Sequence, residues 1–286
     1  LDTALRGTGL PYGSNLIHSP NEPASEQAAV DLYLERGIRR VSASAYMTLT
    51  PMVVQYAFRG IFRDPSGAIV RPNYLFAKIS RPEVAERFLT PPPADMLDTL
   101  VREGRLTPSE AELARSLPVA EDVIVESDSG GHTDNQTLGA LFPSIMEVRD
   151  RVTAEHNYTR PIRLGAAGGI GTPSAAASAF MLGAAFIVTG SINQAAVESG
   201  LSPVGKTMLA DTDLSDVVMA PAADMFELGV KVQVLSRGSL FGVRAHQLYD
   251  MYVRHAGLHD LSDADRKQLE SRVFQRSLDS VWADTE

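Results

Sequence analysis

Apolar runs of strand length alternate with segments of helical periodicity along most of this chain. This alternation predicts parallel strands joined by helices, which is an α/β fold. Some of the runs carry little polarity, as expected for strands in a sheet that is covered on both faces. The expected strands are residues 12–18, 38–45, 74–80, 122–125, 162–164, 185–188 and 216–220.

Helical periodicity fills most of the intervals between these strands. The expected helices include residues 28–34, 48–56, 138–150, 174–182 and 240–253, and residues 225–282 are expected to be mostly helical. Gly37 is a candidate C-cap for the first helix. Two apolar arms around Asp-Pro-Ser-Gly at residues 64–67 predict a β-hairpin.

Residues 82–118 separate two expected strands by far more than a usual βα loop. Two short helices are expected between residues 94 and 117, and Thr107 with Glu110 forms a capping-box pattern at the start of the second. We interpret the segment as a helical insertion that serves as a lid or a substrate-binding segment.

The chain length of 286 residues suits one TIM (β/α)8 barrel. Six or seven strands are expected, whereas a closed barrel needs eight. Because Leu1 is not preceded by Met and a strand begins near residue 11, we expect the first strand to lie in a segment upstream of the numbered chain. The expected domains are a barrel over residues 1–235, which includes the insertion, and a helical C-terminal segment over residues 236–286.

Composition narrows the classes of function. There is no cysteine, which excludes thiolate metal sites and a cysteine nucleophile. The formal net charge of −9 argues against general nucleic-acid binding, because phosphate neutralisation needs a basic surface. No apolar run is long enough for a membrane helix and no signal peptide pattern is present, so a cytoplasmic location is expected.

Two glycine-rich loops with hydroxyl groups follow neighbouring expected strands, at residues 165–173 and 189–194. Backbone N–H groups and hydroxyls in front of a helix bind phosphate. Neither loop has the spacing of a Rossmann fingerprint or a P-loop. Each loop alone also fits a tight βα connection, and their adjacency favours phosphate. The candidate residues are Gly168, Gly169, Gly171, Thr172, Thr189, Gly190 and Ser191.

His132 follows Gly130 and Gly131 at the end of the strand over residues 122–125. Glycines permit close approach of the backbone to a bound group, and imidazole exchanges protons near neutral pH. Asp134, two residues on, also favours a site role for His132. The alternative is a histidine that is hydrogen-bonded to a loop carbonyl.

Three further residues lie at expected strand ends. Lys78 stands in an apolar strand, where its burial is costly unless an anion faces it, although it could also extend to solvent. Asn15 could hydrogen-bond a ring edge or form a turn. His18 is a weaker candidate because Ser-Pro follows it. No histidine pair has zincin spacing, so no metal site is expected.

Seven segments together resemble the nitronate monooxygenase-like flavin barrels. The likeness is greatest to the PfaD-type enoyl reductases of trans-acyltransferase polyketide synthases and polyunsaturated fatty acid synthases. The segments that carry it are residues 126–135, 165–172, 188–194, 15–23, 78–84, 220–234 and 276–284.

The resemblance implies an FMN-dependent enoyl reductase that uses NADPH and acts in trans on α,β-unsaturated thioesters carried by an acyl carrier protein of the synthase complex. It implies that the FMN phosphate lies on the two glycine-rich loops, with Gly130 and Gly131 beside the flavin. Asn15 and Lys78 would contact the isoalloxazine edge, and His132 would be the catalytic residue.

Three other functions remain open on the same residues. A nitronate monooxygenase would use FMN and O2, with His132 as the base. A flavin-free scaffold protein of the synthase would keep the barrel alone. A phosphate-binding isomerase would use the loops without flavin or NADPH.

Overall fold

The computed structural model describes residue 8 and residues 10–285, which form two compact units. The first unit comprises the described chain up to residue 128 and residues 134–189; the second comprises residues 129–133 and the described residues from 190 onward. Each unit is considered by itself. The domain boundary at residue 235 stays a prediction.

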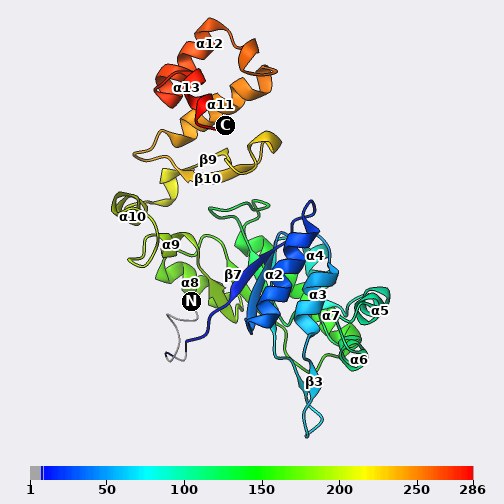
Figure 1. Cartoon of the computed structure of the whole chain (residues 1–286). Helices are drawn as coiled ribbons and strands as arrows, with labels where there is room; N and C mark the ends of the chain where they lie inside the picture. The colour runs from blue at the N-terminus through cyan, green and yellow to red at the C-terminus, as the bar shows by residue number, and fades with distance from the viewer. Residues whose placement is uncertain (1–7, 9, 286) are drawn as a thin grey trace. The chain divides into compact units, whose positions relative to one another are not determined.

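The first unit is built on a six-stranded parallel sheet (Figure 1). Neighbouring strands in the sheet follow one another in chain order, apart from the hairpin inserted between the second and third, as in consecutive units of a (β/α)8 barrel. The predicted α/β fold class is therefore confirmed. The strands in order are β1 (Ser14–Ile17), β2 (Arg40–Ser44), β5 (Tyr74–Ile79), β6 (Asp122–Glu126), β7 (Arg163–Ala167) and β8 (Phe186–Val188).

Five helices follow strands of this sheet and pack with it around one apolar core that includes Val30, Phe88, Phe142 and Leu164. Figure 1 shows α2, α3 and α4 lying along the sheet. The helices are α2 (Pro23–Glu35), α3 (Pro51–Phe58), α4 (Pro82–Leu89), α7 (Leu138–His156) and α8 (Pro173–Met181).

Proline defines where several of these helices begin. α2, α3, α4 and α8 each have proline in the first turn, where its missing N–H removes no helical hydrogen bond and its fixed φ suits the helix. At the other end of α2, Gly37 has φ +65°, as expected after a C-cap. No helix in the described chain is long and apolar enough to cross a membrane.

The helical insertion is part of the core of the first unit. It contains α5 (Ala94–Arg102) and α6 (Pro108–Ala114), and Thr107 and Glu110 form the predicted capping box. Leu97 and Leu100 are fully buried, and Glu110 Oε1 accepts a 2.6 Å hydrogen bond from the N–H of Gly60, just beyond α3.

These contacts lie at the amino edge of the sheet, because α3 starts after the carboxyl end of β2 and runs back towards the hairpin of β3 (Phe62–Arg63) and β4 (Ile69–Val70). The expected lid therefore gains no support from α5 and α6. Within residues 82–118, only the start of α4 lies at the carboxyl edge of the sheet.

The second unit differs from the sequence-based expectation in one respect. The strand expected at residues 216–220 is β9 (Val217–Pro221), but it pairs antiparallel with β10 (Lys231–Leu235), which lies in the segment predicted to be helical. The sequence Lys-Val-Gln-Val-Leu alternates polar and apolar residues and is rich in β-branched valine. This two-residue period favours a strand, although the flanking sequence has helical periodicity.

The remainder of the second unit is helical. α11 (Phe241–Arg254) packs against β9, where a Cβ at Gly242 would lie 3.0 Å from a Val218 methyl group. Met251, Leu269 and Leu278 form a small core beneath it. The other elements are α9 (Ser191–Gln194), α10 (Pro203–Ala210), η1 (Leu214–Asp216), η2 (Phe226–Leu228), η3 (Leu258–Asp260), α12 (Asp263–Gln268), the π-helix η4 (Leu269–Phe274) and α13 (Leu278–Ala283).

We predict that Leu100→Ala lowers the free energy of unfolding by about 2–5 kcal/mol, because it leaves a cavity in a packed core. Leu32→Ala, at a helical leucine that is 48% exposed, is the control and should have a much smaller effect. Urea unfolding measures both. Equal effects would mean that α5 is not a core element.

Candidate functional site at the carboxyl edge of the sheet

The strand register of the first unit brings the predicted loop ends to one edge. Glu126 pairs with Ala167, and Ala167 pairs with Val188. Because the strands are parallel, the residues that follow, Gly168 and Thr189, come next to each other at the carboxyl edge. The two glycine-rich loops therefore begin side by side, while Gly190 and Ser191 already belong to the second unit.

The first glycine-rich loop requires glycine at one position and leaves open space at others. Gly168 has φ +97°, and a Cβ there would lie 2.5 Å from the carbonyl oxygen of Ser127. Gly169 has φ +67°, and at Gly169 and Gly171 a Cβ would meet nothing within 4 Å. The backbone is thus bare on the side a Cβ would occupy, which suits close approach by an anion.

Thr172 links this loop to α8. It is the N-cap residue of α8, and its hydroxyl oxygen accepts a 3.1 Å hydrogen bond from the N–H of Ala175. A hydroxyl that accepts in this way still has a proton to donate. Loop and helix start therefore supply donor groups of the kind that hold a phosphate.

Lys78 on β5 has an anionic partner that the sequence did not reveal. Its Nζ donates a 2.6 Å hydrogen bond to Oε1 of Glu126 at the end of β6. The two side chains are 28% and 18% exposed, so the pair is largely desolvated. The ammonium group has two further protons with which to contact a ligand.

Asn15 on β1 is joined to the next strand by its side chain. Its Oδ1 accepts a 2.6 Å hydrogen bond from the hydroxyl of Ser44, the last residue of β2. Its backbone oxygen accepts from the hydroxyl of Tyr33 at 2.8 Å. These bonds fix the amide at the same edge as Lys78, because β2 lies between β1 and β5.

His132 belongs to the second unit, and its position is described within that unit. Its Nε2 lies 3.1 Å from Oδ2 and 3.3 Å from Oδ1 of Asp224. The hydrogen bond with His132 lowers the pKa of Asp224 below its usual range. In the same unit, a Cβ at Gly130 would lie 3.2 Å from the Ser191 hydroxyl, while one at Gly131 would meet nothing within 4 Å.

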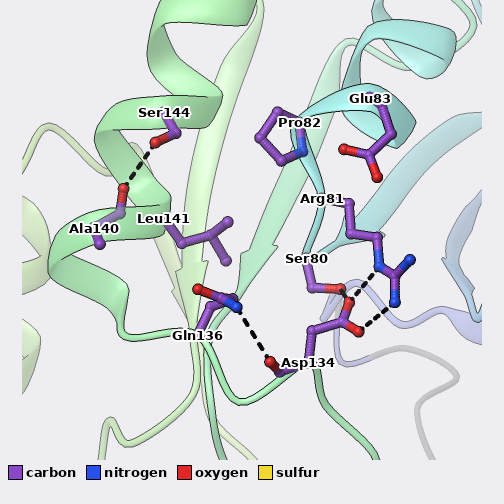
Figure 2. Close-up of a pocket in the computed structure, with 9 residues that line it drawn as sticks. All are labelled: Ser80, Arg81, Pro82, Glu83, Asp134, Gln136, Ala140, Leu141 and Ser144. Carbon is purple, nitrogen blue, oxygen red and sulfur yellow. Dashed lines mark hydrogen bonds and ion pairs between the residues drawn. The ribbon is translucent and has the colours of Figure 1, made fainter.

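Asp134, whose place two residues after His132 favoured a site role for that histidine, lies in the first unit and pairs there with Ser80 and Arg81. Its carboxylate accepts hydrogen bonds from the Ser80 hydroxyl and from two guanidinium nitrogens of Arg81, the latter at 2.9 and 2.7 Å. Figure 2 shows the three side chains together. The pKa of Asp134 is lowered, mainly by the hydrogen bond from Arg81 and further by the hydrogen bond from Ser80.

These residues line a hollow of about 390 Å³ between the starts of α4 and α7. Six of the nine residues that line it have polar or charged side chains. The lining residues are Ser80, Arg81, Pro82, Glu83, Asp134, Gln136, Ala140, Leu141 and Ser144.

Sequence reasoning missed the carboxylate partners of the site residues. Glu126 and Asp224 both lie in segments that carry the family resemblance, which was the one available signal. Spacing along the chain was uninformative, because Asp224 is 92 residues from His132. No cluster of three or more His, Asp or Glu side chains able to hold a metal occurs in the described part of the chain.

Comparisons with known proteins give matches that span almost all of this chain within longer proteins. No family model matches it. It is 46% identical over 278 residues, 97% of the chain, to the polyketide biosynthesis protein PksE of Bacillus subtilis. It is 45% identical over 277 residues, 96% of the chain, to one of the polyunsaturated fatty acid synthase proteins of Thraustochytrium.

The solved enoyl reductase domain of MlnA, from the macrolactin cluster of Bacillus amyloliquefaciens, superposes with a TM-score of 0.90 at 39% identity over 99% of this chain. The chain spans 36% of PksE, 18% of the Thraustochytrium synthase protein and 64% of the MlnA domain.

These matches first define the class: an α/β barrel-type protein homologous to segments of polyketide and polyunsaturated fatty acid synthases. The chain belongs to the family that those segments share with the enoyl reductase domain of MlnA. The resemblance found in the sequence is thereby confirmed.

We predict that Gly168→Ala destabilises the protein by about 1–3 kcal/mol, because alanine is strained at φ +97° and its Cβ would collide with Ser127. Gly171→Ala, in the same loop but with open space around the new methyl group, is the matched control. Thermal unfolding compares them, and equal midpoints would refute the loop geometry.

We also predict a pH-dependent contribution of Asp134 to stability. A depressed pKa stabilises the fold above the unfolded-state pKa of about 3.9, and this contribution is lost as the pH falls through the lower folded-state pKa. Asp134→Asn should therefore be less stable than wild type at pH 7, with the gap closing below about pH 3.9. Urea unfolding across pH tests this; a constant gap would contradict it.

Proposed function

We propose that this protein is an FMN-dependent enoyl reductase that uses NADPH to reduce α,β-unsaturated thioesters carried in trans by an acyl carrier protein. The observation that carries the proposal is the match over 99% of the chain to the MlnA enoyl reductase domain. The relatives named as polyketide and fatty acid synthase proteins support a place in a synthase complex. A cytoplasmic location stays a prediction.

The residues of the glycine-rich loops fit the phosphate of FMN. Gly169 and Gly171 offer bare backbone, and Thr172 offers a hydroxyl at the start of α8. In this proposal Thr189, Gly190 and Ser191 complete the phosphate site, and Gly130 and Gly131 lie against the ring system. When bound, FMN would relay hydride from NADPH to the β-carbon of the enoyl group.

Lys78 and Asn15 would hold the isoalloxazine edge. An ammonium beside an electron-accepting ring stabilises the negative charge that the ring gains on reduction. Glu126 fixes the Lys78 ammonium at 2.6 Å, which lowers the cost of orienting it but also offsets part of its charge. Lys78→Met should therefore weaken flavin reduction more than Glu126→Gln does.

His132 would supply the proton that the α-carbon takes up. Asp224 contacts one ring nitrogen and would orient the imidazole for proton transfer. The start of α4, with the hollow beside Arg81, is the part of the 82–118 segment that would receive the carrier's arm.

Anaerobic addition of NADPH to protein loaded with FMN tests the proposal directly. We expect the flavin absorbance near 450 nm to bleach and to return when crotonyl thioester is added. Protein that takes up no FMN would instead support a scaffold role in the synthase. A flavin that responds to propionate-3-nitronate and O2 but not to the thioester would support a nitronate monooxygenase.

His132→Ala separates catalysis from cofactor retention. We expect FMN content and bleaching by NADPH to stay normal, while thioester turnover falls about 10²–10⁴-fold, as for loss of a general acid. His259→Ala, at an exposed histidine of the same unit, is the control. Loss of FMN together with activity would assign His132 to cofactor retention.

A further inference from the structure

A buried carboxylate lies beneath His18, at the same carboxyl edge of the sheet. His18 directly follows β1, and its N–H donates a 3.0 Å hydrogen bond to Ser44 O, which continues the β1–β2 pairing by one residue. Its Nδ1 lies 2.9 Å from Oε2 of Glu26 on α2. The Glu26 side chain is 0% exposed, whereas that of His18 is 17% exposed.

Three side chains form hydrogen bonds with the carboxyl group of Glu26. Oε1 accepts from the Tyr46 hydroxyl at 2.7 Å and from the Thr50 hydroxyl at 2.5 Å. Burial, and then the bond to Glu26, raise the pKa of Tyr46, so its hydroxyl remains a donor. Both hydroxyls donate to Oε1, so Oε2 is the oxygen that accepts the Nδ1–H of His18.

This arrangement leaves the other ring nitrogen of His18 for a ligand. The imidazole stacks on Tyr46 at 5.1 Å and 23°, and Tyr46 in turn meets Phe88 edge-on at 5.9 Å. No hydrogen bond to Nε2 is present among the described residues. A carboxylate at Nδ1 orients the ring, and in the imidazolium form Nε2–H is a charged hydrogen-bond donor.

The charged and titratable groups near Glu26 also favour His18 as its ionic partner. The titratable groups that act on the cluster are Glu26 and Tyr33 from α2 and Tyr46 from the segment after β2. Among the described residues, no lysine or arginine forms an ion pair with Glu26. Since a buried carboxylate is costly without a compensating cation, the one partner available to compensate it is His18.

We propose that His18 is a ligand-binding residue of the site, held by Glu26 as a positioning residue, and that its Nε2–H binds an oxygen atom that is anionic or becomes so. This inference rests on the proposed function, in which that oxygen is the thioester carbonyl. When hydride forms the C–H bond at the β-carbon, the π electrons move to this oxygen and give the enolate. His18 stabilises the oxygen by a hydrogen bond, and the α-carbon proton comes from another group.

Steady-state and half-reaction kinetics test the proposal with His18→Ala. Loss of one donor to a developing oxyanion costs about 10²–10³-fold in kcat. We expect that loss for crotonyl thioester, with FMN content and bleaching by NADPH unchanged. His156→Ala is the matched control, because His156 stacks on Tyr158 at 5.3 Å and 11° in the same unit. Normal turnover by His18→Ala would overturn the inference and leave the proposed function intact.

Nitrogen NMR of the histidine rings tests the pairing without any turnover. In wild type the signals that disappear in His18→Ala should show a protonated Nδ1 that is hydrogen-bonded to a carboxylate. Glu26→Gln, which retains acceptor and donor atoms of similar size, should shift the Nδ1 signal because it replaces the charged acceptor. An unprotonated Nδ1, or an Nδ1 signal unchanged in Glu26→Gln, would refute the inference even if the protein proves to bind no flavin.

Discussion

The parallel register of the six-stranded sheet is the constraint on which the candidate site depends. Parallel pairing sends every strand's carboxyl end to one edge, so residues scattered from Asn15 to Thr189 come together without any shared sequence motif. Asn15 and Lys78 stand on strands and Gly168 directly follows one, so the strand ladder fixes their backbone positions. The loops can then vary while the spacing of the strand ends stays set by hydrogen bonds.

Charge at this edge is arranged in pairs. Lys78 faces Glu126, Arg81 faces Asp134 and His18 faces Glu26, and each pair joins two different elements of the first unit. Pairing reduces the cost of desolvating each ion. It also means that a ligand at this edge meets groups that are already oriented, which reduces the entropy lost on binding.

Much of the fold could be predicted from the sequence, because hydrophobic periodicity and turn-forming residues are local signals. Apolar runs located all six parallel strands, and Asp-Pro-Ser-Gly located the hairpin. β10 was missed because its five-residue alternation lies within helical surroundings. The positions of Lys78, Asn15 and the glycine-rich loops followed from strand ends, but their partners did not. Glu126 and Glu26 are found only by register and helix packing, which a single sequence does not encode locally.

Residues 129–133 belong to the second unit, although first-unit residues flank them on both sides. The polypeptide therefore passes between the units at three places, and the second unit is not a contiguous piece of the gene. A fragment that starts at Gly190 would lack Gly130 and the imidazole that meets Asp224. Excision or grafting of the C-terminal part would thus separate groups that the intact chain supplies from two distant stretches of its sequence.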